Sequence, residues 1–323
     1  MIRWIRKLYN RWEVEAFRHA LLNDAMRWIA PAPCRPEPHT WSADDVTCSW
    51  LGHSTVLINF YGITILTDPV LGRRMGFKLG PFVLGPKRYV QPALRYYELP
   101  PIDLVLVSHG HMDHLDYWTL RRMDAASTVV TSRNTSDLLR HTWLTDVREL
   151  GWHEITTLFR DRGGLKIHAF PTSHWGARVR SDHHRAWNGY ILERNGRRIL
   201  FGGDTGYTRM FEQLRSHGPF DIAIMPIGAY RPWLVNHCTP EQALQMCDEA
   251  GAQYIVPIHH QTFRLSWEPM GEPIARLEKA VSDAPHRLAL RRIGETFVLP
   301  AAPTQQLTHP FLQSSELSKA AGE

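Results

Sequence analysis

The sequence predicts an α/β domain in which helices lie outside layered β-structure. From residue 46 onward, short apolar strands recur, and they are followed by polar loops and helical segments. Of the 323 residues, 43% are hydrophobic and 21% are charged, which suits a chain with a sizeable core. No run of 18 apolar residues occurs, so we expect no membrane-spanning helix.

The first 40 residues are expected to form a separate N-terminal unit. Apolar side chains between Ile5 and Ala16 recur at helical spacing, which predicts an amphipathic helix over residues 1–30. Six basic and three acidic residues in this segment leave two interpretations open. The helix could lie on an anionic membrane surface, or it could pack on its own domain or a partner subunit. The proline-rich residues 31–38 would then act as a stiff connector.

Residues 41–300 are expected to form the main domain, and residues 301–323 a loose tail. Residues 71–100 are rich in glycine and proline and show little periodicity, which predicts a long loop. Strands are predicted at residues 46–50, 54–60, 64–67, 104–107, 128–131, 165–170, 190–193, 198–201, 222–226 and 254–257. Helices are predicted near residues 117–123, 135–141, 207–216 and 271–282, and one begins at Pro240 after the N-cap Thr239.

The strongest chemical signal is a histidine cluster directly after the predicted strand at residues 104–107. Four side chains that can bind metals, His109, His111, Asp113 and His114, lie within six residues. Imidazole and carboxylate groups are ligands for zinc, iron or manganese. His109 and His111 are two residues apart and would project together from an extended loop, while the other two turn toward a different point. One metal cannot easily take all four, but two adjacent metals can share them.

Three later segments would complete two such sites. His174, Asp204 and His259 each follow the end of a predicted strand. The carboxyl ends of strands are where α/β proteins usually assemble their sites. Each residue is a weak signal alone, because a single histidine or aspartate after a strand is often structural. Together they supply the missing ligands.

At these motifs the sequence resembles the metallo-β-lactamase superfamily. Within it, the chain is most similar to the branch that contains the phospholipase D acting on N-acyl-phosphatidylethanolamine and the ascorbate-6-phosphate lactonase. The resemblance rests on residues 50–55, 66–69, 109–116, 174–175, 203–207, 225–230 and 237–241. It implies an αβ/βα sandwich, with two mixed β-sheets flanked by helices.

The resemblance also implies a ligand set and a nucleophile. His109, His111 and His174 would hold one metal, and Asp113, His114 and His259 the other, with Asp204 bridging. A hydroxide bound to both metals would be the nucleophile, and Asp113 could also orient it. We expect two divalent ions, with zinc favoured over manganese or iron. Relatives usually have an aromatic residue after the last ligand histidine, where this chain has His260. The register Pro257-Ile-His259 favours His259 as the ligand, so His260 is expected to line the pocket or to support a ligand from behind.

Several other residues are secondary candidates. Asp68 could be a buried acceptor that orients a ligand histidine, or an aspartate that caps the turn before Pro69. His237 could protonate a leaving group or grip the substrate if its pKa lies near neutrality. The residues expected to contact substrate, which could equally be structural or rim residues, are His53, Trp175, Arg178, Tyr230 and His260.

These features favour a metal-dependent phosphodiesterase that acts on a phospholipid of the N-acyl-phosphatidylethanolamine type. The alternative is a lactonase or other esterase acting on a phosphorylated small molecule, because the same hydroxide would serve. The chain lacks a basic aromatic module, so we expect no nucleic-acid partner. A di-iron redox enzyme is disfavoured because such relatives usually carry glutamate where His111 stands and append a flavin domain. A non-catalytic metal-binding scaffold remains a further alternative.

The cysteines and the N-terminal segment bear on where the protein is located and what it contacts. Four scattered cysteines and the lack of a convincing secretory signal favour a cytoplasmic protein. The basic N-terminal helix adds a possible peripheral contact with the inner face of the membrane through residues 1–30. Homo-oligomers are also an open possibility.

Overall fold

The computed structural model describes residue 24 and residues 27–79, 82–179 and 181–301. Most of the predicted N-terminal helix and nearly all of the predicted tail at 301–323 lie outside these residues. The proposed membrane contact of residues 1–30 therefore stays a prediction. Within the described part of the chain, no helix is both long enough and apolar enough to cross a lipid bilayer.

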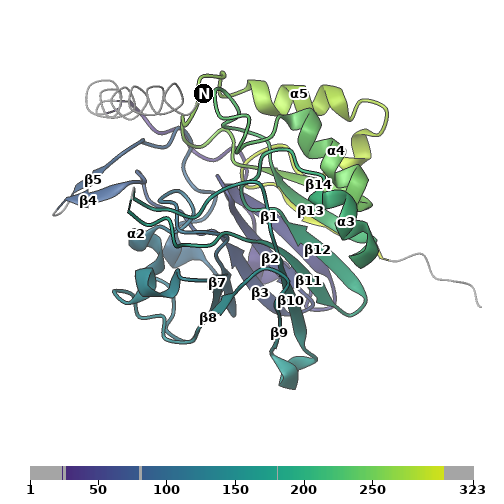
Figure 1. Cartoon of the computed structure of the whole chain (residues 1–323), viewed down its shortest axis with the longest axis horizontal. Coiled ribbons are helices and arrows are strands. Elements are labelled where there is room, and N and C mark those ends of the chain that lie inside the picture. The colour runs from purple at the N-terminus through teal and green to yellow at the C-terminus, as the bar shows by residue number, and fades with distance from the viewer. Residues whose placement is uncertain (1–23, 25–26, 80–81, 180, 302–323) are drawn as a thin grey trace, which may run out of the picture.

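Two mixed β-sheets form the body of the protein (Figure 1). The seven-stranded sheet runs in the order β15 (Thr296–Val298), β1 (Val46–Gly52), β2 (Thr55–Phe60), β3 (Ile63–Thr67), β6 (Leu104–Leu106), β7 (Thr128–Ser132) and β8 (Val147–Leu150). The six-stranded sheet runs in the order β14 (Ala252–Ile258), β13 (Phe220–Pro226), β12 (Arg197–Phe201), β11 (Gly189–Arg194), β10 (Leu165–Phe170) and β9 (Ile155–Leu158). Strands β3, β6, β7 and β8 pair in parallel, as do β12, β13 and β14.

The second sheet contributes side chains to two cores, because alternate residues of its strands point to opposite faces. On β12, Ile199 and Phe201 belong to the core between the sheets, whereas Leu200 joins the core beneath the helices. On β13, Ile222 and Ile224 likewise face the first core and their neighbours face the second. Successive strand residues point to opposite faces, so one apolar strand can serve two layers at once.

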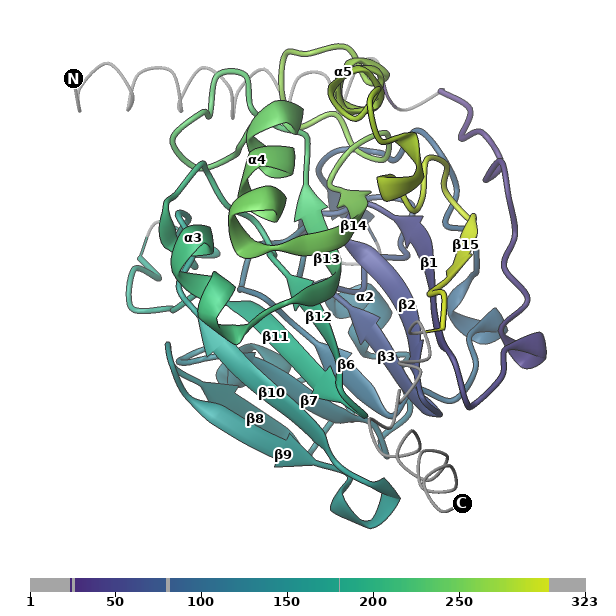
Figure 2. The same cartoon turned by 90° about the vertical axis from the view of Figure 1, so that its right-hand side faces the viewer.

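Helices cover the outer sides of the two sheets. In Figures 1 and 2, α3 (Met210–Leu214), α4 (Pro240–Ala250) and α5 (Glu272–Ala280) lie over the second sheet, and α2 (Tyr117–Leu120) lies on the side of the first. Helix α4 begins as predicted: the Thr239 side chain accepts from the Gln242 amide, and the Gln242 side chain accepts from the Thr239 amide. The layers therefore follow the predicted αβ/βα order.

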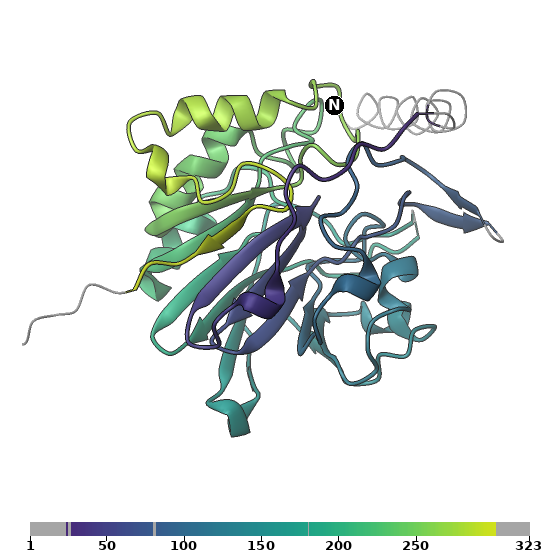
Figure 3. The same cartoon turned by 180° about the vertical axis from the view of Figure 1, so that it is seen from behind.

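The structure of residues 71–100 corrects the prediction that this region is one long loop. It contains the hairpin formed by β4 (Phe77–Leu79) and β5 (Phe82–Leu84), which projects from the body in Figure 3, and the 3₁₀ turn η2 (Tyr96–Glu98). The hairpin closes at its base through glycine. A Cβ on Gly76 would lie 2.2 Å from the Leu84 carbonyl oxygen, so only glycine allows the two chains to approach this closely.

The prediction of a helix at residues 135–141 is also wrong. The segment forms only a 3₁₀ turn, η3 (Ser136–Leu139). The Glu149 carboxylate on β8 accepts hydrogen bonds from the amides of Asn134, Thr135 and Ser136, which fixes the start of the turn against the sheet. The other 3₁₀ turns are η1 (Pro38–Thr40), η4 (Arg160–Arg162), η5 (Arg215–His217) and η6 (Pro285–Arg287). Strands β8, β9 and β15 were not predicted.

A Gly228→Ala substitution is expected to destabilise the protein, because the loop after β13 touches the loop after β14. A Cβ at Gly228 would lie 2.2 Å from the His259 carbonyl oxygen, so the two loops would have to separate. The expected cost is about 1–3 kcal/mol in the free energy of unfolding, measured by urea denaturation. Gly271→Ala is the control, because a Cβ there meets no atom within 4 Å. Equal stability of the Gly228 variant and the wild type would contradict this packing.

Candidate metal centre

The ends of four strands bring the predicted ligands into one buried cluster. His109 follows β6, His174 follows β10, Asp204 follows β12 and His259 follows β14. These strands belong to both sheets, so the cluster lies where the two sheets meet. All four side chains are at least nine-tenths buried. The placement agrees with the expectation that strand ends assemble the site.

Three histidines form the first ligand group. The Nδ1 atom of His111 lies 2.8 Å from Nε2 of His109 and 3.2 Å from Nε2 of His174. One ligand atom from each residue lies within 4.8 Å of the others, a spacing that could hold a single metal ion. An imidazole-only set suits zinc, copper, iron or nickel among the divalent metals.

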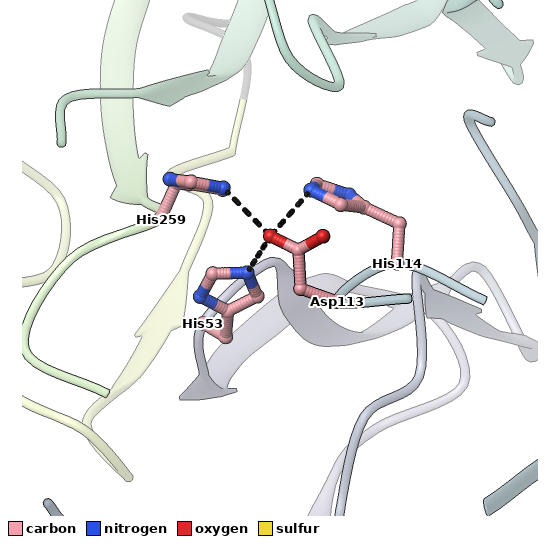
Figure 4. A group of neighbouring side chains, drawn as sticks. All are labelled: His53, Asp113, His114 and His259. Carbon is pink, nitrogen blue, oxygen red and sulfur yellow. Dashed lines mark hydrogen bonds and ion pairs between the residues drawn. The ribbon is translucent and has the colours of Figure 1, made fainter. Parts of the chain in front are cut away.

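Asp113, His114 and His259 form the second ligand group, and His53 joins them (Figure 4). The Oδ2 atom of Asp113 is the common point. It lies 3.3 Å from Nε2 of His259, 3.7 Å from Nε2 of His114 and 3.1 Å from Nε2 of His53. The sequence analysis placed His53 among the substrate-contacting candidates, whereas the structure places it against a predicted metal ligand.

Asp204 lies between the two groups. Its Oδ2 atom is 3.0 Å from Nε2 of His114 and 3.2 Å from Nε2 of His259, which belong to the second group. The same oxygen is 3.7 Å from Nε2 of His174 in the first group. One carboxylate therefore faces both groups, as a bridging ligand would.

The cluster fits divalent cations on the chemistry of its buried donor atoms. Nε2 of His114 and Nε2 of His259 face carboxylate oxygens without a well-formed hydrogen bond, and Oδ1 of Asp204 has no hydrogen-bond partner. Buried polar atoms are normally satisfied, and a convergent set of them is costly unless a cation lies among them. The nitrogen and carboxylate donors are those that divalent transition metals prefer.

Two histidines of the cluster have a raised pKa because they face carboxylates. Burial alone would lower the pKa of His114 and His259, but Asp204 and Asp113 outweigh it. The pKa of His114 is raised well above its usual range, and that of His259 is raised to about 9. Burial would likewise raise the pKa of the two aspartates, yet these histidines hold it well below the usual range. Metal binding must therefore displace protons from the cluster.

A second layer of hydrogen bonds orients the ligands. Oδ2 of Asp68 lies 2.6 Å from Nδ1 of His114 and accepts from the Ser108 hydroxyl at 2.6 Å. The Ser108 hydroxyl is also 2.9 Å from Nδ1 of His109. The Val70 amide, which a turn-capping aspartate would bind, donates instead to Thr55. Asp68 therefore orients a histidine of the cluster, the first of its two predicted roles.

Two predicted substrate residues lie against the cluster and contact the protein around it. The Trp175 ring packs on His111 and His174, with ring centroids 4.6 Å and 4.4 Å away. Arg178 donates to the carbonyl oxygens of Gly110 at 3.0 Å and Leu115 at 2.8 Å. Arg178 thus ties down the loop that carries four of the predicted ligands.

Tyr230 and His260 differ in their relation to the site. Tyr230 is fully buried, and its hydroxyl donates to Glu272 on α5 at 2.8 Å. His260 stacks on Trp50 at a centroid distance of 4.3 Å, and neither of its ring nitrogens has a hydrogen-bond partner. His260 also lines a small hollow of about 20 Å³ beside His259, which is room for about one water molecule. Of these two, His260 is the better placed to meet a substrate.

His237 lies beside the cluster, but its pKa is too low for a general acid at neutral pH. Its Nδ1 atom is 4.0 Å from Oδ2 of Asp204, and its ring is 5.1 Å from that of His174. Burial lowers the pKa of His237 to about 4, although Asp204 opposes this shift. The imidazole is neutral at pH 7, so the condition set for proton donation is not met in the metal-free protein.

Three residues that hold the site together were not predicted from the sequence. Ser108 directly precedes the histidine motif, and its position was a usable signal. The Asn236 carbonyl oxygen lies 3.0 Å from Nδ1 of His174, and a backbone contact of this kind leaves no mark on side-chain patterns. Thr262 accepts from the His53 amide at 2.7 Å across 209 residues, which no local pattern predicts.

The comparisons with known proteins identify the family. A model described as the beta-lactamase superfamily domain matches residues 64–260. The chain therefore belongs to the metallo-β-lactamase superfamily, as the resemblance at its motifs implied. A metallo hydrolase from the archaeon Ignicoccus hospitalis has a similar fold: the TM-score is 0.60 at 20% identity, over 80% of this chain and 99% of that one.

The chain is similar in sequence to two relatives that it matches over most of its length. The chain is 34% identical over 310 residues to an uncharacterised protein of Mycobacterium tuberculosis, covering 93% of this chain and 79% of that protein. It is 33% identical over 255 residues to the N-acyl-phosphatidylethanolamine-hydrolyzing phospholipase D 1 of Caenorhabditis elegans, covering 72% of this chain and 69% of that protein. The family and the His/Asp cluster together indicate a metal-dependent hydrolase.

The metal-free protein is expected to be most stable near pH 6.5. Below that pH, unfolding takes up protons on buried histidines whose pKa is lowered in the fold, each costing up to about 1.4 kcal/mol per pH unit. These are His53, His109, His111, His174, His237 and His260. Above it, the stabilising contribution of protonated His259 is lost as the pH approaches its folded pKa of about 9.

Thermal unfolding followed by circular dichroism, in chelator and from about pH 5 to about pH 9, measures this dependence. The midpoint should fall on both sides of its maximum. A midpoint that stays constant between about pH 5 and about pH 7 would show that these histidines are not held neutral by burial.

Proposed function

We propose that the protein is a two-metal phosphodiesterase that hydrolyses phospholipids of the N-acyl-phosphatidylethanolamine type. The observation that carries the proposal is the meeting of two ligand groups at the buried carboxylate of Asp204. The substrate class is supported by the relative from Caenorhabditis elegans, which is named for the hydrolysis of that lipid.

Within this proposal, His109, His111 and His174 would hold one ion, and Asp113, His114 and His259 the other. Zinc is the expected metal, because a set of imidazoles and carboxylates without thiolates suits it, with manganese or iron as alternatives. When bound, two such cations would supply Lewis-acid polarisation of a phosphoryl oxygen and activation of water.

The residues around the ligands would prepare the site for substrate. Trp175 packs against the rings of His111 and His174 and would help to hold them in place. Neutral His237 can donate one hydrogen bond to a substrate oxygen, and it needs no change of charge to do so. Phe263 and Leu265 line the small hollow beside His259, and these apolar side chains would meet the apolar part of a lipid at its rim.

The proposal is tested by turnover with and without metal. Purified protein should hydrolyse bis-p-nitrophenyl phosphate and N-acyl-phosphatidylethanolamine in detergent, and lose this activity on chelation. Asp204→Ala should reduce the rate by more than about 100-fold, because it removes the group shared by both metals. Asp161→Ala, at an exposed position on η4, is the control and should keep full activity.

Other outcomes discriminate between functions. Opening of lactones without cleavage of phosphodiesters would replace the proposed reaction by the alternative ester hydrolysis. Activity that survives both chelation and the Asp204 substitution would contradict a metal-dependent mechanism of either kind.

A further inference from the structure

The backbone at His53 has an unfavourable conformation that its neighbours maintain. Its φ angle is 51°, in the left-handed region that residues other than glycine rarely adopt. The His53 amide donates to Thr262 Oγ1 at 2.7 Å. Its carbonyl accepts from Trp50 Nε1 at 2.7 Å and from the His259 amide at 3.0 Å. Such conformations are unfavourable and persist where the surroundings fix them, often at functional sites.

These contacts direct the His53 ring at the second ligand group (Figure 4). The side chain is 1% exposed, so it has no access to bulk water. The ring lies against Phe263 at a centroid distance of 5.2 Å and against His259 at 4.3 Å. Its Nε2 atom lies 3.1 Å from Oδ2 of Asp113.

The chemistry of Asp113 settles which way this hydrogen bond runs. A carboxylate must be ionised to hold a metal, and an ionised carboxylate only accepts hydrogen bonds. The proton must therefore lie on Nε2 of His53, and a protonated nitrogen has no lone pair for a metal. His114 shows the opposite arrangement: its Nδ1 faces the Asp68 carboxylate, which leaves Nε2 free to bind a cation. Nδ1 of His53 has no such partner.

We propose that His53 is a positioning residue that donates a hydrogen bond to Asp113 and holds this carboxylate toward the second cation. In this role His53 is neither a contact for substrate nor an additional metal ligand. The proposal rests on the metal-binding part of the proposed function and does not depend on the substrate.

The test replaces His53 by leucine and by glutamine, and measures bound metal rather than activity. Leucine removes the donor, whereas the glutamine amide can restore it. Cobalt titration followed by visible absorption, with elemental analysis of the dialysed protein, should show two cations in the wild type. In His53→Leu the second cation should bind about 10- to 100-fold more weakly, with the first unchanged. His53→Gln should recover most of the loss and keep the wild-type cobalt spectrum.

His168→Leu is the matched control. His168 is a buried histidine on β10 whose ring lies beside His217, so its loss should leave both cations in place. If His53→Leu does not fold, Thr262→Val carries the test, because it removes the acceptor of the His53 amide and should weaken the second cation alone.

Three results would overturn the proposal. Unchanged affinity for both cations in His53→Leu would show that Asp113 needs no such support. A glutamine variant as defective as the leucine variant, with an altered cobalt spectrum, would make His53 a ligand. A wild-type protein that binds fewer than two cations would overturn the proposed function as well, whereas two cations without turnover would overturn only the substrate.

Discussion

The contact between Asp204 and His114 joins the two sheets of this protein, and the arrangement of the site depends on it. His114 follows β6 of the first sheet, and Asp204 follows β12 of the second. Their side chains meet 3.0 Å apart at positions that water does not reach. Each charge is buried, and burial of either alone would be strongly unfavourable. The packing of the two sheets therefore brings His114 and Asp204 together, and each compensates the buried charge of the other.

The same constraint explains the strain around the cluster. His53, Asp68 and His259 have φ angles of 51°, 30° and 63°, all in or near the left-handed region. Each residue directly follows the end of a strand or lies within two residues of it, where the chain must turn sharply to aim a side chain inward. Burial of apolar side chains between the sheets and under the helices stabilises the fold and offsets the free-energy cost of these backbone conformations.

The sequence predicted those parts of the structure that local patterns encode. Strand β6 is a continuous apolar run and strand β12 ends in three apolar residues, each before a polar motif, and both strands were predicted within one residue of their bounds. Strand β8 was missed because its two central residues, Arg148 and Glu149, are polar, so no apolar run marks it. Strand β15 gains its place only by pairing with β1, 250 residues away in sequence.

The site shows the same division. The resemblance at the motifs supplied the ligand groups, and the structure brings those residues together. Two of their supports could not be predicted, because they are long-range: Thr262 fixes His53, and Asn236 meets His174 through its backbone. The interpretation of Tyr230 as a substrate residue followed from its neighbours in sequence, whereas its side chain is directed to Glu272 on α5.

Anomalous X-ray diffraction from crystals of zinc-loaded protein, recorded on both sides of the zinc absorption edge, tests the central claim most directly. The account predicts two peaks in each molecule, one among His109, His111 and His174 and one among Asp113, His114 and His259, with Asp204 between them. A single peak, or peaks that lie away from these residues, would contradict a two-metal centre.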